Sequence, residues 1–266
     1  MNIMQAGAGT LIREWRRRRR MSQLSLALEA EVSQRHLSFV ESGRSAPSRD
    51  MVLRLADQLS MPLRQRNRIL VAAGFAPIYG ERPLDDPALR PALTAVELVL
   101  KGHEPYPAIA VDKGWNMVLA NGAIAPLLEG VEEPALLSPP VNVLRLSLHP
   151  KGLAPRIANL DEWRMHLIER LRTQIEATAD PALETLEKEL SAYPGGSRGN
   201  GRHYDAAAHI AVPLRLRIGG EVLSFISTIT VFGTPLDVTL SELAVETFFP
   251  ADAQTGEILR RLATKP

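Results

Sequence analysis

The chain has 266 residues, 45% of them hydrophobic, and it contains no cysteine. This length and hydrophobic content are sufficient for two packed domains, and the lack of cysteine excludes a disulfide framework or a thiolate metal site. Charge is divided unevenly: residues 1–80 carry 13 Lys and Arg against 6 Asp and Glu, whereas residues 81–266 carry 18 against 24. Net charges of +7 and −6 therefore confine an expected attraction for nucleic-acid phosphates to the N-terminal part.

Residues 22–44 have the pattern of two short helices joined by a tight turn. Ser22 and Ser33 stand where a hydroxyl can cap each helix, and Gly43 stands where the second should end. Apolar residues at helical spacing predict that each helix buries one face in a shared core: Leu24, Ala27 and Leu28 in the first, Leu37 and Val40 in the second.

The residues left over on the second helix are polar. Gln34, Arg35, His36 and Ser38 form this outward set, and Gln and Arg can make paired hydrogen bonds to adenine and guanine in a major groove. Phe39 either lies on the same side, where it can touch a thymine methyl, or belongs to the core. The pattern indicates a DNA-reading helix-turn-helix.

Three more helices complete an expected five-helix, all-α domain over residues 1–75. One runs over about residues 11–20, one follows a cap at Ser48, and one begins near Pro62 and ends before Gly74. The arginine run at residues 16–20 is weak evidence by itself, because it can be a solvated helix face.

Residues 8–74 resemble the lambda repressor/Cro-like, or XRE-type, regulators. The resemblance rests on Gln23, Ala27, the Val32-Ser33 turn, Leu37, and the run Glu41-x-Gly43-Arg44 followed by Pro47-Ser48. It implies phosphate contact by Gln23, base contacts by the early residues of the second helix, and backbone contact by Arg44. The DNA-binding residues expected in all are Gln23, Ser33, Gln34, Arg35, His36, Ser38, Arg44 and Arg49. One departure is Glu31, which stands where the family usually has glycine at a left-handed turn.

Residues 76–90 are rich in proline and predict a linker, so the second domain is expected over residues 91–266. Its first β-prone runs, at residues 108–111 and 116–120, surround a turn at Asp112-Lys113-Gly114, and Asn121 is expected to cap a short helix through Leu128. Helices are expected at about 160–177 and 181–192, a loop at Gly195–Gly201, and strands at 210–218, 222–232 and 240–249. These elements predict an α+β domain with an antiparallel sheet of about five strands and helices on one face, which resembles a PAS fold.

Three segments of this domain resemble the MmyB-like transcription regulators, whose ligand-binding domain follows an XRE-type module. They are residues 142–153, residues 159–163 and residues 246–252. The resemblance covers nearly the whole chain, and it implies a PAS-like sensor that can hold a fatty acid in its core. We expect no other cofactor.

A fatty acid needs an apolar tunnel and a polar partner for its carboxylate. Arg145 can supply that partner, or it can point to solvent or pair with Glu162. The expected ligand-binding residues are Trp115, Leu144, Arg145, Leu148, His149, Trp163, Phe225, Phe232 and Phe249, although each aromatic residue among them can equally be ordinary core.

Catalytic and metal-binding patterns are absent from the sequence. Five of the six histidines fall in the second domain, but none has a tight metal spacing, and His203 with His209 is unconvincing. No G-x-S-x-G, P-loop or dinucleotide fingerprint occurs. We expect a protein that is not an enzyme. Because no signal peptide or long apolar run is present, we also expect it to be soluble and cytoplasmic, with no membrane partner.

These features predict a transcriptional regulator that binds a double-stranded operator as a homodimer and senses a small apolar ligand such as a fatty acid. The alternative is a DNA-binding adaptor whose second domain docks a protein partner and binds no ligand. A closed apolar cavity in the second core favours the sensor, and a flat exposed apolar patch favours the adaptor.

Overall fold

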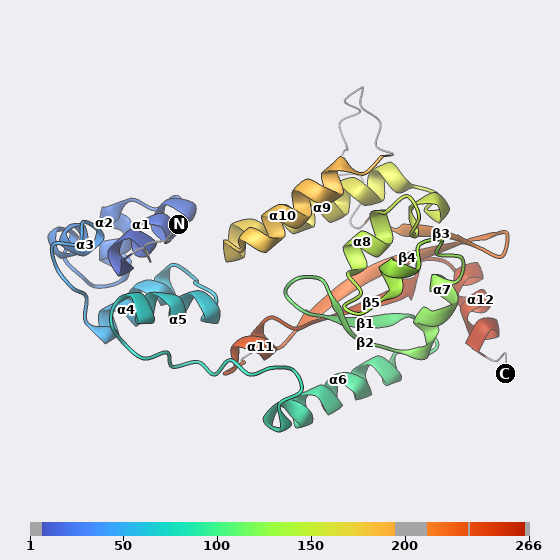
Figure 1. Cartoon of the computed structure of the whole chain (residues 1–266), viewed down its shortest axis with the longest axis horizontal. Coiled ribbons are helices and arrows are strands. Elements are labelled where there is room, and N and C mark those ends of the chain that lie inside the picture. Colours follow the sequence, from blue (N-terminus) through green and yellow to red (C-terminus); the bar gives the residue numbers. More distant parts are fainter. Residues whose placement is uncertain (1–6, 195–211, 234, 264–266) are drawn as a thin grey trace. The chain divides into compact units, whose positions relative to one another are not determined.

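The computed structural model describes residues 7–194, 212–233 and 235–263. The chain divides into two compact units, the first built mainly from residues up to Arg82 and the second mainly from residues 83–263. Figure 1 shows the helices of the first unit in blue and cyan and the sheet of the second in green to red. Each unit has its own hydrophobic core, as the domain-sized apolar content of the sequence predicts.

The N-terminal unit is a bundle of five helices, which confirms the predicted all-α domain. They are α1 (Ala8–Arg18), α2 (Gln23–Glu29), α3 (Gln34–Glu41), α4 (Arg49–Gln58) and α5 (Leu63–Ala72). Serine hydroxyls cap three of them: Ser22, Ser33 and Ser48 accept hydrogen bonds from the backbone N–H groups of Ser25, His36 and Met51.

The buried face of α2 differs from the predicted one. Leu26, Ala27 and Ala30 are buried, whereas Leu24 and Leu28 are 61% and 77% exposed. The two alanines lie one turn apart and allow α3 and α4 to approach α2 closely, and Leu26 fills the space beside them. The leucine pair, which lies on a different side of this short helix, is therefore left facing solvent.

All five helices of this unit end in the same way. A residue with positive φ follows each helix, and the next amide donates back to a carbonyl in its last turn, as Val32 does to Ala27 at 2.9 Å. These left-handed residues are Arg20, Glu31, Gly43, Ser60 and Gly74. The structure thus confirms the left-handed turn at Glu31, whose φ is +54°.

The second unit contains a five-stranded, entirely antiparallel sheet with the order β2-β1-β5-β4-β3. The strands are β1 (Ala108–Val111), β2 (Met117–Ala120), β3 (Leu214–Ile218), β4 (Glu221–Val231) and β5 (Ala244–Pro250). The sheet confirms the predicted α+β class. It brings β1, from the start of the domain, beside β5, from its end.

Helices cover both faces of this sheet, not one as predicted. Figure 1 shows α6 (Arg90–Gly102) on one side, and α8 (Val143–Leu148), α9 (Leu160–Thr178) and α10 (Pro181–Ala192) on the other. Ala108 and Ala110 pack with Val96 and Leu100 of α6, whereas Ile109 belongs to the main core beneath α9. All four residues of β1 are buried, because the strand is covered on both sides. Three further helices are short or peripheral: α7 (Ala125–Leu128), α11 (Val238–Ser241) and α12 (Ala253–Ala263).

Two local predictions for this unit are wrong. Residue 240 lies in α11, so the last strand begins at Ala244. Asn121 does not cap the helix after it: its side-chain oxygen accepts from Ala108 N–H, and its amide nitrogen donates to Leu100 and Tyr106 carbonyls. It therefore ties α6 to β1. The glycine-rich loop at 195–201, His203, His209 and residues 210–211 of the predicted strand lie outside the described residues. The described part of that strand begins at Leu214, so Val212 and Pro213 precede it, contrary to the prediction.

Candidate functional site

The outward surface of α3 carries the polar side chains that the sequence singled out. Gln34, Arg35 and His36 are exposed in its first turn, and Ser38 is half-buried one turn later. Ser33 fixes the start of this helix, because its hydroxyl accepts the His36 N–H at 3.1 Å. The N-terminal end of α3 therefore presents donors and acceptors to solvent.

Phe39 was predicted either to lie on the outward side of the second helix or to belong to the core, and the structure places it between these two positions. It is half-buried and lies outside the cluster that forms the core of the unit. The guanidinium carbon of Arg35 lies 5.5 Å from the centre of its ring. The aromatic face restricts the arginine side chain and leaves its fork of N–H donors available for another partner.

A buried ion pair holds the first three helices together. Arg16 of α1 donates from Nε and Nη2 to the two carboxylate oxygens of Glu41 in α3, at 2.7 and 2.8 Å. Gln23, the first residue of α2, donates to the same carboxylate at 2.8 Å. Burial alone would raise the pKa of Glu41, but these hydrogen bonds and the charges of Arg16 and Arg13 hold it below its ordinary value. The network joins α1, α2 and α3 through one buried carboxylate and so restricts the orientation of α3.

The remaining predicted DNA-binding residues flank α3. Arg44 is exposed directly after Gly43, and Arg49 is exposed in the first turn of α4. Gln23 is half-buried, with its amide nitrogen occupied by Glu41. Exposed arginines at these positions have the chemistry to contact phosphates.

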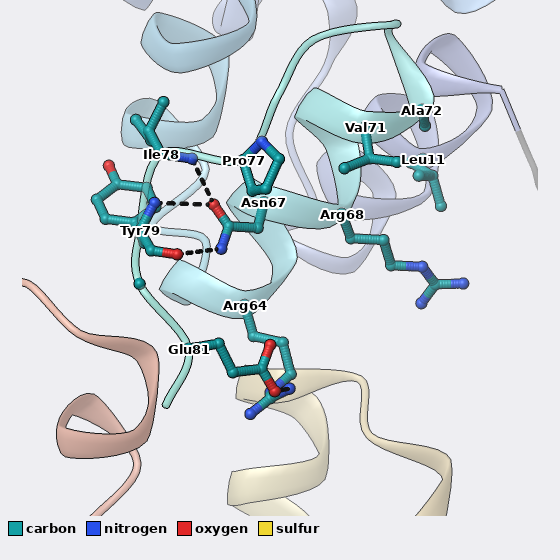
Figure 2. Close-up of a pocket in the computed structure, with 11 residues that line it drawn as sticks. Leu11, Arg64, Asn67, Arg68, Val71, Ala72, Pro77, Ile78, Tyr79 and Glu81 are labelled. Atoms are coloured by element: carbon teal, nitrogen blue, oxygen red, sulfur yellow. Dashed lines mark hydrogen bonds and ion pairs between the residues drawn. The ribbon is translucent and has the colours of Figure 1, made fainter. Parts of the chain in front are cut away.

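A separate hollow of about 710 Å³ lies between α1, α5 and the segment at residues 77–81. Figure 2 shows how Asn67 of α5 holds this segment: its carbonyl oxygen accepts the N–H groups of Ile78 and Tyr79, and its nitrogen donates to the Tyr79 carbonyl. Arg64 pairs with Glu81 beside it. Part of the proline-rich stretch is thus fastened to the helical bundle.

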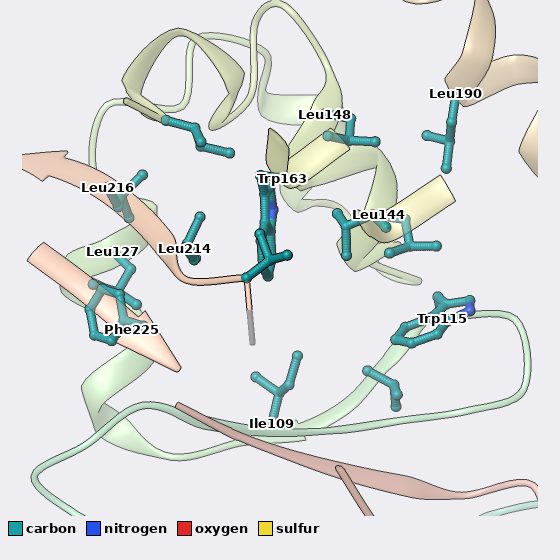
Figure 3. Close-up of a cluster of buried hydrophobic side chains, with 14 of the residues drawn as sticks. Ile109, Trp115, Leu127, Leu144, Leu148, Trp163, Leu190, Leu214, Leu216 and Phe225 are labelled. Carbon is teal, nitrogen blue, oxygen red and sulfur yellow. The ribbon is translucent and has the colours of Figure 1, made fainter. Parts of the chain in front are cut away.

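The second unit contains a cavity of about 90 Å³ between the sheet and the helices α7, α8 and α9. Its walls are almost entirely apolar. Figure 3 shows Trp163 of α9 standing between Leu144 of α8 and Leu214 of β3, with Phe225 and Ile109 on the sheet side. The Trp163 ring nitrogen donates to the Ser147 hydroxyl at 3.0 Å, so the polar part of this large side chain is satisfied within the wall.

The structure brings three of the nine predicted ligand-binding residues to this cavity: Leu144, Trp163 and Phe225. Trp115 and Leu148 are buried in the same core but do not line the cavity. Phe232 packs into the second cluster beneath α6, and Phe249 is 43% exposed, with its ring 4.7 Å from that of His103. The aromatic residue of β5 that lines the cavity is Phe248.

Arg145 and His149 lie outside the cavity, on the outer side of α8. Arg145 donates from Nε and Nη2 to the two oxygens of Glu189, both at 2.8 Å, which corrects Glu162 as its expected partner. Glu189 also accepts from the Tyr193 hydroxyl, and burial together with this bond raises the Tyr193 pKa to about 12. The His149 ring packs edge-on against Tyr193. These groups form a surface cluster that joins α8 to α10.

Sequence reasoning missed Glu246 of β5, a charged residue that lines the cavity, and its ion-pair partner Arg170 of α9, which lies behind it. Glu246 is 5% exposed and lines the cavity, and its Oε1 accepts from Arg170 Nη1 at 3.0 Å. The helical spacing of Trp163, Leu167 and Arg170 puts all three on the sheet-facing side of α9, and this signal could have identified Arg170.

Arg170 sits in an aromatic environment. Its guanidinium carbon lies 4.4 Å from the centre of the Trp115 ring, while its Nε and Nη2 atoms are buried and have no hydrogen-bond partner within the part of the chain that the structure describes. One turn earlier, burial and the Arg170 charge lower the pKa of His166. His166 is therefore held towards its neutral form.

The described ranges contain no group of three or more histidine or acidic side chains arranged to hold a metal ion. None of the helices in these same ranges is both long and apolar enough to cross a membrane.

A helix-turn-helix bundle with an exposed polar recognition face, followed by an α+β domain around an apolar cavity, defines a DNA-binding regulator with a ligand-binding domain. A helix-turn-helix family model matches residues 12–65, and the model for the MmyB-like transcription regulator ligand binding domain matches residues 92–262. The chain belongs to this MmyB-like family, as the resemblance in its sequence implied. No curated protein matches the chain. Both matched families are domains of transcription regulators and not of enzymes.

Proposed function

We propose that the chain is a sequence-specific transcriptional regulator whose N-terminal unit reads operator bases through α3. The exposed set Gln34, Arg35 and His36, on a helix whose orientation the buried Arg16–Glu41 pair restricts, is the observation that carries this proposal. Ser38 extends the reading surface, and Gln23, Arg44 and Arg49 position it on phosphates. The net charge of +7 over residues 1–80 supports the same assignment.

The regulator binds as a homodimer to an operator with two half-sites. Helix-turn-helix modules of this kind read half-sites about 34 Å apart, one turn of the duplex, so the expected footprint has two protected stretches with that spacing. Footprinting over a range of salt concentrations tests both points. A discrete site that is protected at lower protein concentrations than the flanking DNA, at each salt concentration where binding is seen, supports the proposal, whereas a diffuse, salt-sensitive association with no protected site contradicts it.

The second unit senses a small apolar ligand that enters the cavity beside Trp163. The support is the apolar lining of the cavity, combined with membership in a ligand-binding domain family. A fatty acid is the candidate that the family resemblance implied. At about 90 Å³ the cavity is smaller than the 300–1,000 Å³ that is typical of ligand pockets, so a long acyl chain requires the helices to move outward from the sheet.

Native mass spectrometry of the purified protein, before and after denaturation, tests the ligand directly. We expect a retained apolar molecule, or a melting temperature that rises when either decanoate or decanol is added. A bare chain mass together with an unchanged melting temperature contradicts the proposal. In that case the adaptor function, in which the second unit docks a protein partner, becomes the better explanation.

A further inference from the structure

We propose that the cavity selects a ligand whose polar end is a neutral hydrogen-bond donor, such as a hydroxyl group, and that Glu246 receives it. This inference rests on the proposed binding of a small apolar ligand in the cavity and specifies the chemistry of that ligand. It differs from the expectation of an ionised fatty acid held by an arginine.

The cavity wall contains few polar groups. Among the described residues that line the cavity, Glu246 is the charged one and Ser147 is the other polar one. Ser147 already accepts a hydrogen bond from Trp163. Within the described chain, the bond from Arg170 to Oε1 is the side-chain hydrogen bond that Glu246 accepts, and a carboxylate has about four acceptor positions. The cavity therefore offers unused acceptor capacity at Glu246.

Arg170 neutralises the charge of Glu246 from behind the cavity wall. Its side chain is 17% exposed and lies against Trp115, and it does not line the cavity. Its unpartnered Nε and Nη2 atoms are inaccessible, so they present no donor to a molecule inside the cavity. The cavity wall thus contains the Glu246 carboxylate, whose charge Arg170 balances. This pairing permits the burial of the carboxylate but leaves one of its acceptor positions facing the ligand.

An acceptor of this kind favours a ligand with a hydroxyl group over one with an ionised carboxylate. A hydroxyl group placed beside Glu246 donates a charge-assisted hydrogen bond in an apolar surrounding. An ionised carboxylate at the same place has no hydrogen to donate and brings a second negative charge into a low-dielectric cavity that already holds Glu246. A carboxylic acid can bind there only in its protonated form.

The test uses two probes with the same short tail, pentanol and pentanoate, which suit a cavity of this size. Titrations of the full chain are followed by NMR of labelled methyl groups, since Ile109, Leu144 and Leu214 line the cavity and report binding there. At neutral pH, we expect pentanol to bind with a Kd about tenfold lower than that of pentanoate, which corresponds to about 1.4 kcal/mol.

Glu246→Ala should invert this preference. The variant leaves Arg170 without its carboxylate, so pentanoate can supply the missing partner while pentanol loses its acceptor. The matched control is Glu189→Ala, which removes a glutamate paired with an arginine in the same unit but away from the cavity, and it should keep the wild-type preference. The double variant Arg170→Met/Glu246→Met replaces both charges. It should bind pentanol about tenfold more weakly than the wild type does because the acceptor is lost, while pentanoate is still excluded by the cost of burying an unpaired charge, and this keeps the test decisive if Glu246→Ala does not fold.

The outcomes separate the two proposals. If neither probe shifts the cavity methyl groups of the wild type, both the ligand-sensing function and this inference fail. If both probes bind the wild type equally, or pentanoate binds better, ligand binding stands and the donor selection is overturned. A pentanol Kd that is unchanged in Arg170→Met/Glu246→Met also overturns the role of Glu246.

Discussion

Each unit of this protein buries an arginine–glutamate pair, and the two pairs are completed in different ways. In the N-terminal unit, Glu41 accepts two hydrogen bonds from Arg16 and a third from Gln23. In the second unit, Glu246 accepts one from Arg170, whose remaining nitrogens have no partner among the described residues. The first pair is surrounded by three helices, and the second borders a cavity.

The difference indicates what each pair does. A buried charge is stable when its hydrogen-bonding capacity is filled, so the Arg16–Glu41 pair suits a structural role that orients α3. A pair with unused capacity beside a cavity suits a site that a ligand completes. Breaking either pair, or changing the surface that it supports, should therefore have different consequences.

Glu41→Ala should have the largest effect, because it leaves Arg16 buried without its counter-charge. We expect a loss of about 3–5 kcal/mol in the unfolding free energy of the N-terminal unit, measured by hydrogen exchange of the amides in α3. Glu189→Ala breaks a more exposed pair and should cost its own unit less than about 1 kcal/mol. Equal losses in the two variants would contradict the assignment of Arg16–Glu41 as the structural pair.

Arg170→Met tests the second pair by leaving Glu246 unpaired in an apolar wall. The single variant should lose about 3 kcal/mol of stability, and Arg170→Met/Glu246→Met should recover most of it, since replacing both charges removes the unpaired ion. The unfolding free energy of each variant can be measured by hydrogen exchange of the β5 amides in the full chain at increasing urea concentrations. A double variant as unstable as the single one would show that the pair does not act as a unit.

Arg35→Ala and Arg44→Ala separate base reading from phosphate contact. Arg35→Ala should reduce discrimination between the operator and other sequences by about 1–3 kcal/mol, whereas Arg44→Ala should weaken binding to all sequences alike. Titrations of specific and random duplexes at one salt concentration give both values. The assignment fails if both variants lose the same affinity on both kinds of DNA.

Acidification should weaken the N-terminal unit through Glu41. Its pKa is lowered in the folded state, so its stabilising contribution is complete above the ordinary glutamate pKa of 4.5 and is lost as pH falls through the lower folded value. Stability measured between neutral and acid pH should fall less steeply in Glu41→Gln than in the wild type. Parallel pH profiles would exclude this contribution.

Glu31→Gly should have the smallest effect, because it acts on a single left-handed turn. Glycine adopts the φ of +54° without the steric cost of a side chain, although it also loses more freedom on folding. We expect a net stabilisation of about 0.5 kcal/mol. Leu28→Gly, at an exposed position in α2, should instead destabilise by about 1 kcal/mol, and chemical denaturation distinguishes the two signs.

Much of the N-terminal unit could be predicted from the sequence because its signals are local. Ser22, Ser33 and Ser48 cap helices from within three residues, and Gly43 ends one. The burial of α2 could not be read in this way, because the spacing of Leu24 and Leu28 is as helical as that of Ala27 and Ala30. Which side is buried depends on how closely α3 approaches, which is a tertiary property.

The ligand cavity depends on tertiary structure throughout. Trp163, Phe225 and Glu246 lie on a helix and two strands, and the pairing of β4 with β5 together with the packing of α9 on the sheet places them around one space. From its residue type, Phe249 was predicted to bind the ligand. Side chains alternate between the two faces of β5, however, so its neighbour Phe248 lines the cavity and Phe249 does not. Arg145 fits a carboxylate as the sequence suggested, and that carboxylate belongs to Glu189.

The measurement that tests the central claim most directly is the affinity of the full chain for a duplex selected by this protein from random sequences, compared with a scrambled duplex of the same composition. If α3 reads bases, the Kd for the selected duplex should be at least about a thousandfold lower at physiological salt, as for other specific regulators. If selection yields no recurring sequence, or if the two duplexes bind equally and release alike as salt rises, α3 does not read bases and the claim is contradicted.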